Sequence, residues 1–156
     1  MSNTFSIDTP CAHGELTLSG VASAAIAVAG TYYVANSGGT TTLTSGDGFD
    51  TSASGRLRYI GTKTIMAHCG ATVSFTYNST SQVIRVRAAL NGTTIAASEV
   101  ALKYGTSGDE VSTALHFMTE LATNDYLELF VTDDLGTSKV VTIDKANIFA
   151  IAVPNC

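Results

Sequence analysis

Apolar and polar residues alternate through much of the last quarter of the chain. Leu127, Leu129 and Val131 fall on one face of this segment, whereas Tyr126 and Phe130 fall on the other. A period of two is typical of a β-strand that packs one face into a core. The pattern therefore predicts paired strands of a β-sandwich rather than a helix.

The run Ile148–Val153 is apolar on both faces. A strand of an antiparallel sheet normally exposes one face to water, so a strand that is apolar on both faces needs cover on both sides. One face can pack into the sandwich, and the other needs an outer element of the chain or a neighbouring subunit. The run predicts an oligomeric all-β protein with a structural or binding role.

Other segments alternate in the same way, and together they predict eight to ten strands with no helix. Asn91-Gly92 is typical of a two-residue hairpin turn, because both residues tolerate positive φ. Residues 37–54 are rich in Gly, Ser and Thr and are expected to form a loop that Leu43 and Phe49 anchor. This number of strands suits an antiparallel jelly-roll sandwich. The residues expected to lie buried between its two sheets are Val73, Phe75, Ile84, Val86, Leu102, Leu115, Phe117, Leu127, Leu129 and Ile143.

Residues 1–20 are expected to form an N-terminal arm, and residues 21–156 the jelly-roll domain. The arm starts with polar residues and contains Pro10, which cannot donate a hydrogen bond to a neighbouring strand. Its apolar residues are spaced at two, which would allow the arm to add a strand to the edge of a neighbouring protein. The candidate docking residues are Phe5, Ile7, Leu16 and Leu18.

Composition and charge limit the kinds of partner that the protein is expected to bind. Of the 156 residues, 45% are hydrophobic and 13% are charged, about half the usual charged fraction, which favours self-association. The net charge of -5 argues against a nucleic-acid partner, which requires a basic face. The pairs Arg56/Arg58 and Arg85/Arg87 each share a strand face and are expected to face solvent. No segment has the pattern of a membrane span or a secretion signal, so no membrane partner is expected.

No group of residues in the sequence has the pattern of a catalytic or metal centre, and neither enzyme activity nor a cofactor is expected. The three cysteines do not make a disulfide framework and are expected to stay reduced, although one of them could join subunits. A zinc site of Cys11, His13, His68 and Cys69 is disfavoured, because adjacent residues of a strand point to opposite faces.

Two regions of the sequence resemble the C1q/tumour-necrosis-factor-like jelly roll. Leu121, the turn Asn124-Asp125, the alternating residues 127–131 and the apolar residues 149–153 follow one another as in that family. Short segments such as Gly55–Gly61 also look like small structural proteins of tailed bacteriophages that share this fold. The resemblance implies an antiparallel jelly roll that forms a homotrimer, with the last strand and its neighbours near the threefold axis. The candidate residues of the trimer interface are Tyr126, Phe130, Phe149, Ile151 and Val153.

The function expected from these observations is that of a non-enzymatic virion structural protein. It would be a trimeric decoration or cement protein on the phage head surface, with the major capsid protein as its partner and the host cytoplasm as its place of synthesis. Repeated contacts of such a trimer with the shell would provide avidity without one strong site. The alternative is a receptor- or glycan-binding tip domain of a tail fibre, which would use loops 104–109 and 133–138. The absence of coiled-coil heptads favours decoration over a fibre, and a small hydrolase would need a nucleophile–base pair that the sequence does not suggest.

Overall fold

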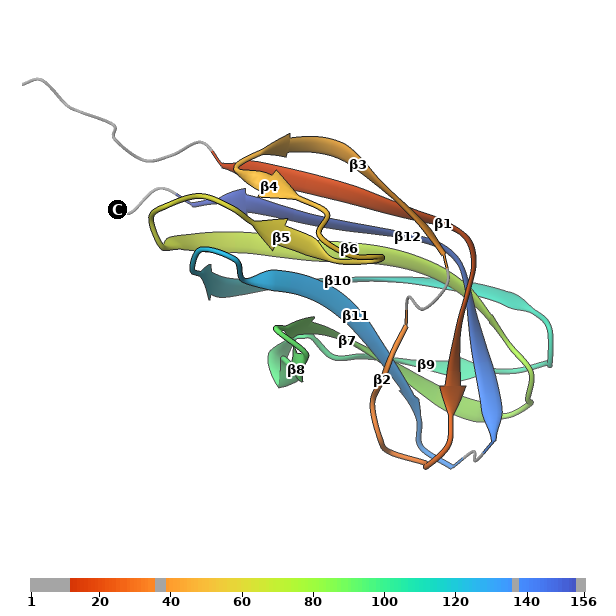
Figure 1. Ribbon diagram of the computed structural model, residues 1–156. Helices are drawn as coiled ribbons and strands as arrows, with labels where there is room; N and C mark the ends of the chain where they lie inside the picture. The colour runs from red at the N-terminus through yellow and green to blue at the C-terminus, as the bar shows by residue number, and fades with distance from the viewer. Residues whose placement is uncertain (1–11, 36–38, 136–137, 154–156) are drawn as a thin grey trace, which may run out of the picture.

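In the computed structural model, the chain forms two antiparallel sheets packed face to face (Figure 1). The structure describes residues 12–35, 39–135 and 138–153, except for the side chains of Val21 and Ala22. The first sheet has five strands in the order β10 (Glu110–Leu121), β6 (Ile65–Tyr77), β12 (Lys139–Ala152), β1 (His13–Ile26) and β3 (Thr40–Asp47).

The second sheet has seven strands, and its central strands β11 and β7 run side by side. Its main path is β4 (Phe49–Asp50), β5 (Leu57–Tyr59), β11 (Tyr126–Asp133), β7 (Gln82–Leu90) and β8 (Thr93–Thr94). In addition, β2 (Tyr33–Val34) pairs with β11, and β9 (Val100–Tyr104) pairs with β7. A single turn of 3₁₀ helix, η1 (Ala96–Ser98), follows β8. Most strand neighbours are distant in sequence, as in a jelly roll, so the predicted all-β antiparallel sandwich is confirmed.

The core lies between the two sheets and contains the residues that the alternation predicts. Nine of the ten predicted core residues are buried, and Leu102 is partly buried against the same cluster. The last strand also follows its pattern: Ile148 and Ala150 point into the core, whereas Phe149 and Ile151 point outward. Because β12 lies between β6 and β1, this apolar strand is central in its sheet.

The prediction that residues 1–20 form an arm outside the sandwich is wrong for its second half. Leu16 and Leu18 are 0% and 2% exposed, because β1 begins at His13 and pairs with β12 and β3 of the same chain. A spacing of two suits the inward face of a core strand as well as an added edge strand, and here the core strand forms. Phe5 and Ile7 lie outside the described residues.

Two further local predictions have different outcomes. Asn91 and Gly92 have φ values of 51° and 80° and join Leu90 to Thr93 in a hairpin, as predicted. Within the segment expected to be a loop, by contrast, Thr40–Asp47 forms the edge strand β3. Phe49 is buried as expected, but Leu43 remains 37% exposed and is a weak anchor.

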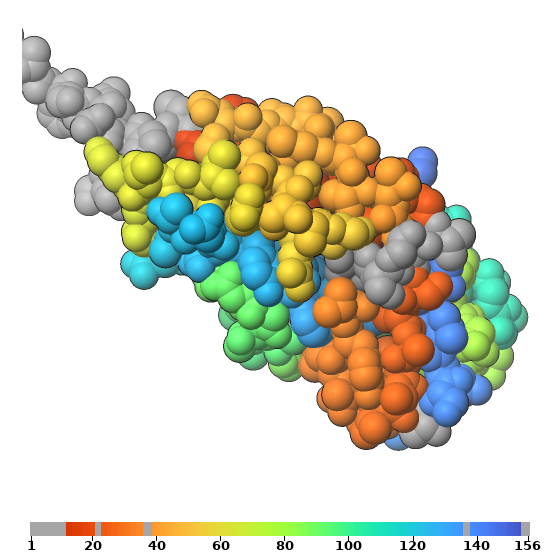
Figure 2. Space-filling view, in the orientation of Figure 1, coloured from red at the N-terminus to blue at the C-terminus, as the bar shows by residue number. Residues whose placement is uncertain are grey.

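The loops gather at the two ends of the sandwich. At one end, the β1–β2 connection contacts the end of β11 through a hydrogen bond from the Gly30 amide to the Asp133 carbonyl. The β6–β7 and β9–β10 connections meet at the same end, where the Ser81 amide donates to the Gly105 carbonyl. We call these four connections, 27–32, 78–81, 105–109 and the described part of 134–138, the distal loops. Figure 2 shows the β1–β2 connection (orange) as a tip far from the start of β1.

Candidate functional site

The outer face of the five-stranded sheet carries a group of large side chains that nothing in the described chain covers. Met66, Met118 and Ile151 are 36%, 51% and 51% exposed on this face. A half-buried phenylalanine and two histidines lie among them. We call this group the β6–β10–β12 patch. It consists of Met66, His68, His116, Met118, Phe149 and Ile151.

One cross-strand row shows how strand register builds the patch. Met118 of β10 lies opposite His68 of β6, and His68 lies opposite Ile151 of β12. On the next strand, His13 of β1 lies opposite Ile151. Opposite residues on one face of a sheet have Cβ atoms about 4.5–5.5 Å apart. Four side chains therefore form a continuous row across four strands.

Gly70 sets the position of the Phe149 ring in the neighbouring row. It lies between His116 and Phe149 and is buried. A Cβ atom at position 70 would lie 2.7 Å from the Phe149 ring and 3.0 Å from the Leu115 carbonyl oxygen. Glycine normally weakens the interior of a strand, and one reason for it there is a close approach by another group. Here that group is the Phe149 ring, which packs over Gly70.

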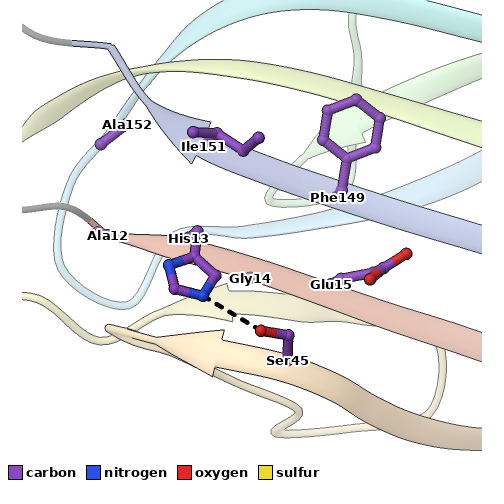
Figure 3. A pocket seen from close by; sticks show the side chains of 8 residues that line it. All are labelled: Ala12, His13, Gly14, Glu15, Ser45, Phe149, Ile151 and Ala152. Atoms are coloured by element: carbon purple, nitrogen blue, oxygen red, sulfur yellow. Dashed lines mark hydrogen bonds between the residues drawn. The ribbon is translucent and has the colours of Figure 1, made fainter.

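The aromatic contacts of the patch involve its histidines. The His68 ring lies edge-to-face with the His116 ring at a centroid distance of 5.8 Å, and with the Phe149 ring at 5.9 Å. At the margin of the patch, the His13 Nε2 atom lies 3.2 Å from the Ser45 hydroxyl oxygen of β3 (Figure 3). The imidazoles thus form part of the surface that a neighbouring molecule would touch.

A shallow groove runs along the margin of the patch, between the end of β12 and the start of β1 (Figure 3). Phe149 and Ile151 form its apolar side, and His13, Glu15 and Ser45 form its polar side. No three His, Cys, Asp or Glu side chains in the described segments are close enough together to hold a metal ion. The groove suits contact with another surface.

The other half of the same face is polar. Thr17, Thr72, Asn147 and Lys145 line a second hollow there. The Asn147 amide donates a hydrogen bond to the carboxylate of Glu15, which lies between the two halves. The face therefore divides along its strands into an apolar half, near the start of β1, and a hydrophilic half.

The structure does not bring the five predicted interface residues together. Phe149 and Ile151 lie in the patch, and Val153 follows directly after β12. Tyr126 and Phe130 lie on β11 in the opposite sheet. The Arg56 guanidinium lies 4.3 Å from the centre of the Tyr126 ring, and Phe130 is half-buried opposite Val34 of β2. These two aromatic residues contact the chain's own elements and lie on the sheet opposite to that of Phe149, so the structure does not place them on one face with it.

An ion-pair network covers the outer face of the seven-stranded sheet. Arg85 donates two hydrogen bonds of 2.7 Å to the Asp134 carboxylate and one of 2.8 Å to Glu99. Arg87 also binds Glu99, and its guanidinium lies 4.4 Å from the centre of the Tyr32 ring. The expectation that Arg85 and Arg87 only face solvent is therefore wrong. Both acidic partners come from distant connections, and no local pattern in the sequence identifies them.

The network strongly stabilises the charged form of Glu99. The Tyr32 hydroxyl donates a 2.6 Å hydrogen bond to this carboxylate, and Arg87 and Arg85 add two more. These bonds lower the pKa of Glu99 to about 2, against the opposing effect of burial. Arg85 lowers the pKa of Asp134 in the same way.

Arg56 and Arg58 also pair with acids rather than with solvent alone. Arg58 forms a two-pronged pair with Asp50, with distances of 2.8 and 2.6 Å, which lowers the pKa of that carboxyl. Arg56 lies 3.1 Å from Glu128, a carboxylate that is buried under the loop carrying Arg56. The acids of this sheet thus have structural roles.

The Cys69 thiol lies in the core, while His68 faces outward. Burial raises the pKa of Cys69 to about 12, so the thiol stays protonated and unreactive at neutral pH. The predicted opposite orientation of these two neighbours is confirmed. Cys11 and Cys156 lie outside the described residues.

Within the described ranges, no helix has the length and apolar character needed to cross a membrane.

Comparison with known proteins identifies the fold. No protein-family model matches the chain, and no curated protein matches it. Among solved structures, the chain is similar to the PRD1 vertex protein P5, with 15% identity, a TM-score of 0.54 and coverage of 92% of this chain and 97% of that chain. It is also similar to Eiger TNF from S. frugiperda, with 8% identity, a TM-score of 0.59 and coverage of 93% and 95%.

A third similar structure is murine APRIL at pH 5.0, with 10% identity, a TM-score of 0.54 and coverage of 89% of this chain and 98% of that chain. All three alignments span nearly the whole of both chains. At these identities the likeness concerns the fold alone. The chain has a C1q/TNF-like jelly roll, as its sequence predicts.

Proposed function

We propose that this protein is a non-enzymatic structural component of a phage particle, and that it acts as a homotrimer. The observation that carries the proposal is the uncovered β6–β10–β12 patch on a sheet face of a TNF-like jelly roll. Patches of large apolar side chains that lack cover within a chain are typical of protein–protein interfaces. Each half-exposed side chain that becomes buried would contribute about 1 kcal/mol.

The partner face is best supplied by other copies of the same chain. The patch consists of outward-facing side chains of β10, β6 and β12, so a partner would pack against the face of the sheet. Its Met, Phe and Ile side chains can pack against two further subunits around a threefold axis, where each contact joins two different parts of the subunit surface. We therefore assign Phe149, Ile151, Met66 and Met118 to the interface, with Val153 at its margin.

The likeness to the PRD1 vertex protein P5 supports a place on a virion. We infer that the trimer decorates the head surface and contacts the major capsid protein. Strand β1 begins at the end of the sandwich opposite the distal loops, and residues 1–11 precede it in the sequence. Phe5 and Ile7 in this segment remain the proposed docking residues.

Electron microscopy of particles that lack this protein tests the location. Heads without surface knobs but with intact tails would support decoration, and adding the purified protein should restore the knobs. Unchanged heads would contradict the proposed location.

The alternative function, recognition of a receptor or glycan, has its own supporting observation. At the distal loops, Val28 and Leu135 are 56% and 77% exposed. Exposed apolar side chains at loop tips can contact a ligand. A V28D/L135D variant should bind particles normally under the decoration proposal. If this variant binds particles but abolishes their adsorption to cells, the receptor-binding function is favoured.

A further inference from the structure

All three histidines of the chain lie on the proposed trimer face, although they are widely separated in sequence. Strands β1, β6 and β10 contribute one each: His13, His68 and His116. Histidine is the side chain whose ordinary pKa, about 6.5, allows a change of charge near neutral pH. The same face therefore combines apolar contact residues with groups that gain charge in mild acid.

His68 and His116 have surroundings that disfavour the charged form once the face is covered. Their rings contact each other, and His68 also contacts the Phe149 ring. In the cross-strand row, His68 lies between Met118 and Ile151. Neither imidazole has an acidic partner in the parts of the chain that the structure describes. Two adjacent imidazolium groups would repel each other, and burial against apolar groups would add a desolvation cost.

The charged groups around His68 and His116 are few and lie at the edges of the patch. Glu120 of β10 lies opposite Met66, and Glu15 of β1 lies opposite Phe149. Asp47 of β3 lies opposite His13, and Lys145 of β12 lies in the polar half of the face. Glu15 is held by the Asn147 amide.

His13 differs from the other two histidines in its charged neighbours. It lies opposite Asp47 and two residues from Glu15 on the same face. These carboxylates can balance a charge on His13. Protonation of His13 should therefore weaken association less than protonation of His68 or His116.

We propose that protonation of His68 and His116 weakens self-association through the β6–β10–β12 patch, so that the trimer is stable at neutral pH and dissociates in mild acid. This inference rests on the proposed trimer. The direction of the pH dependence follows from linkage, because the assembled form buries neutral imidazoles and binds fewer protons than the free subunits. Association is therefore strongest above about pH 6.5 and weakens as pH falls below that value.

The test is sedimentation of the full chain over a range of concentrations at about pH 7.5 and about pH 5.0. For the wild type, the concentration at half-dissociation should rise at least about tenfold at the lower pH. The H68Q/H116Q variant should assemble with the same midpoint at both pH values. H13Q, the matched control, should retain the wild-type shift. Circular dichroism at both pH values separates dissociation from unfolding.

Two results would overturn the inference while leaving the proposed trimer intact. One is a wild-type trimer with the same midpoint at both pH values. The other is a pH-dependent shift that persists in H68Q/H116Q. A wild type that is monomeric at neutral pH would instead contradict the proposed trimer itself, and the inference with it.

Discussion

At the scale of single residues, the position of Gly70 is an unusual feature of the exposed sheet face. A glycine in the middle of β6 contributes no side chain to packing, yet it allows the Phe149 ring to pack close to the backbone of the sheet. The ring in turn forms the centre of the proposed interface. A larger side chain at position 70 should therefore affect both the stability of the subunit and its assembly.

The G70A variant tests this packing. The added methyl group would push against the Phe149 ring and the Leu115 carbonyl oxygen. Overpacking of this kind should lower the free energy of unfolding by about 1–3 kcal/mol, and the displaced ring should weaken assembly. Urea denaturation and sedimentation measure the two effects. G105A is the matched control, since a Cβ there meets nothing within 4 Å. Equal behaviour of the two variants would show that Gly70 does not position the ring.

Glu99 illustrates how one carboxylate can join distant parts of the chain. It connects the β1–β2 connection, through Tyr32, to β7, through Arg85 and Arg87. Its lowered pKa means that the folded state favours the charged carboxylate. This contribution is fully present above the usual pKa of about 4.5 and is lost as pH falls through about 2.

The E99Q variant should be destabilised by about 1–2 kcal/mol at pH 7, after allowance for solvent screening of the ion pairs. The wild type should lose stability between about pH 4.5 and about pH 2 as Glu99 becomes protonated. E99Q should lack this part of the loss. Urea denaturation at a series of pH values measures both. E120Q should stay within about 0.5 kcal/mol of the wild type. An acid profile of E99Q parallel to that of the wild type would contradict the assignment.

At the scale of strands, alternation predicted the central elements well and the edges poorly. Val73, Phe75 and their neighbours repeat with a period of two and are buried, as predicted. The edge strand β3 was missed because its Thr, Ser and Gly residues face solvent and carry no apolar period. The strand β1 was assigned to an arm because the period shows where side chains point but does not show which chain provides the neighbouring strands.

The start of β1 determines where a truncation that tests the docking arm should end. The carbonyl of Ala12 accepts a hydrogen bond from the Ala152 amide, so a truncation should end before residue 12. Removal of residues 1–11 should leave the thermal unfolding temperature and the number of subunits in the oligomer unchanged. It should weaken binding to particles that lack the protein, because Phe5 and Ile7 are lost. F5A/I7A in the full chain is the complementary variant. Unchanged particle binding by both variants would place the docking surface elsewhere in the chain.

At the scale of the whole molecule, the two outer faces of the sandwich differ. The face of the seven-stranded sheet is covered by arginine–carboxylate pairs and short connections. The face of the five-stranded sheet exposes methionine, isoleucine and histidine. In the sequence, Tyr126 and Phe149 look equivalent, because each alternates with core residues along its own strand. Only the arrangement of the sheets separates the two faces, and the period within one strand contains no such information.

The central claim is that the exposed face of the five-stranded sheet joins three subunits, and the native mass tests it most directly. At micromolar concentration and neutral pH, the wild type should have three times the 16.1 kDa mass of the chain. I151D should sediment as a folded monomer, whereas V28D should remain trimeric, although the two replaced side chains are 51% and 56% exposed. A monomeric wild type, or an I151D variant that still forms the trimer, would contradict the account.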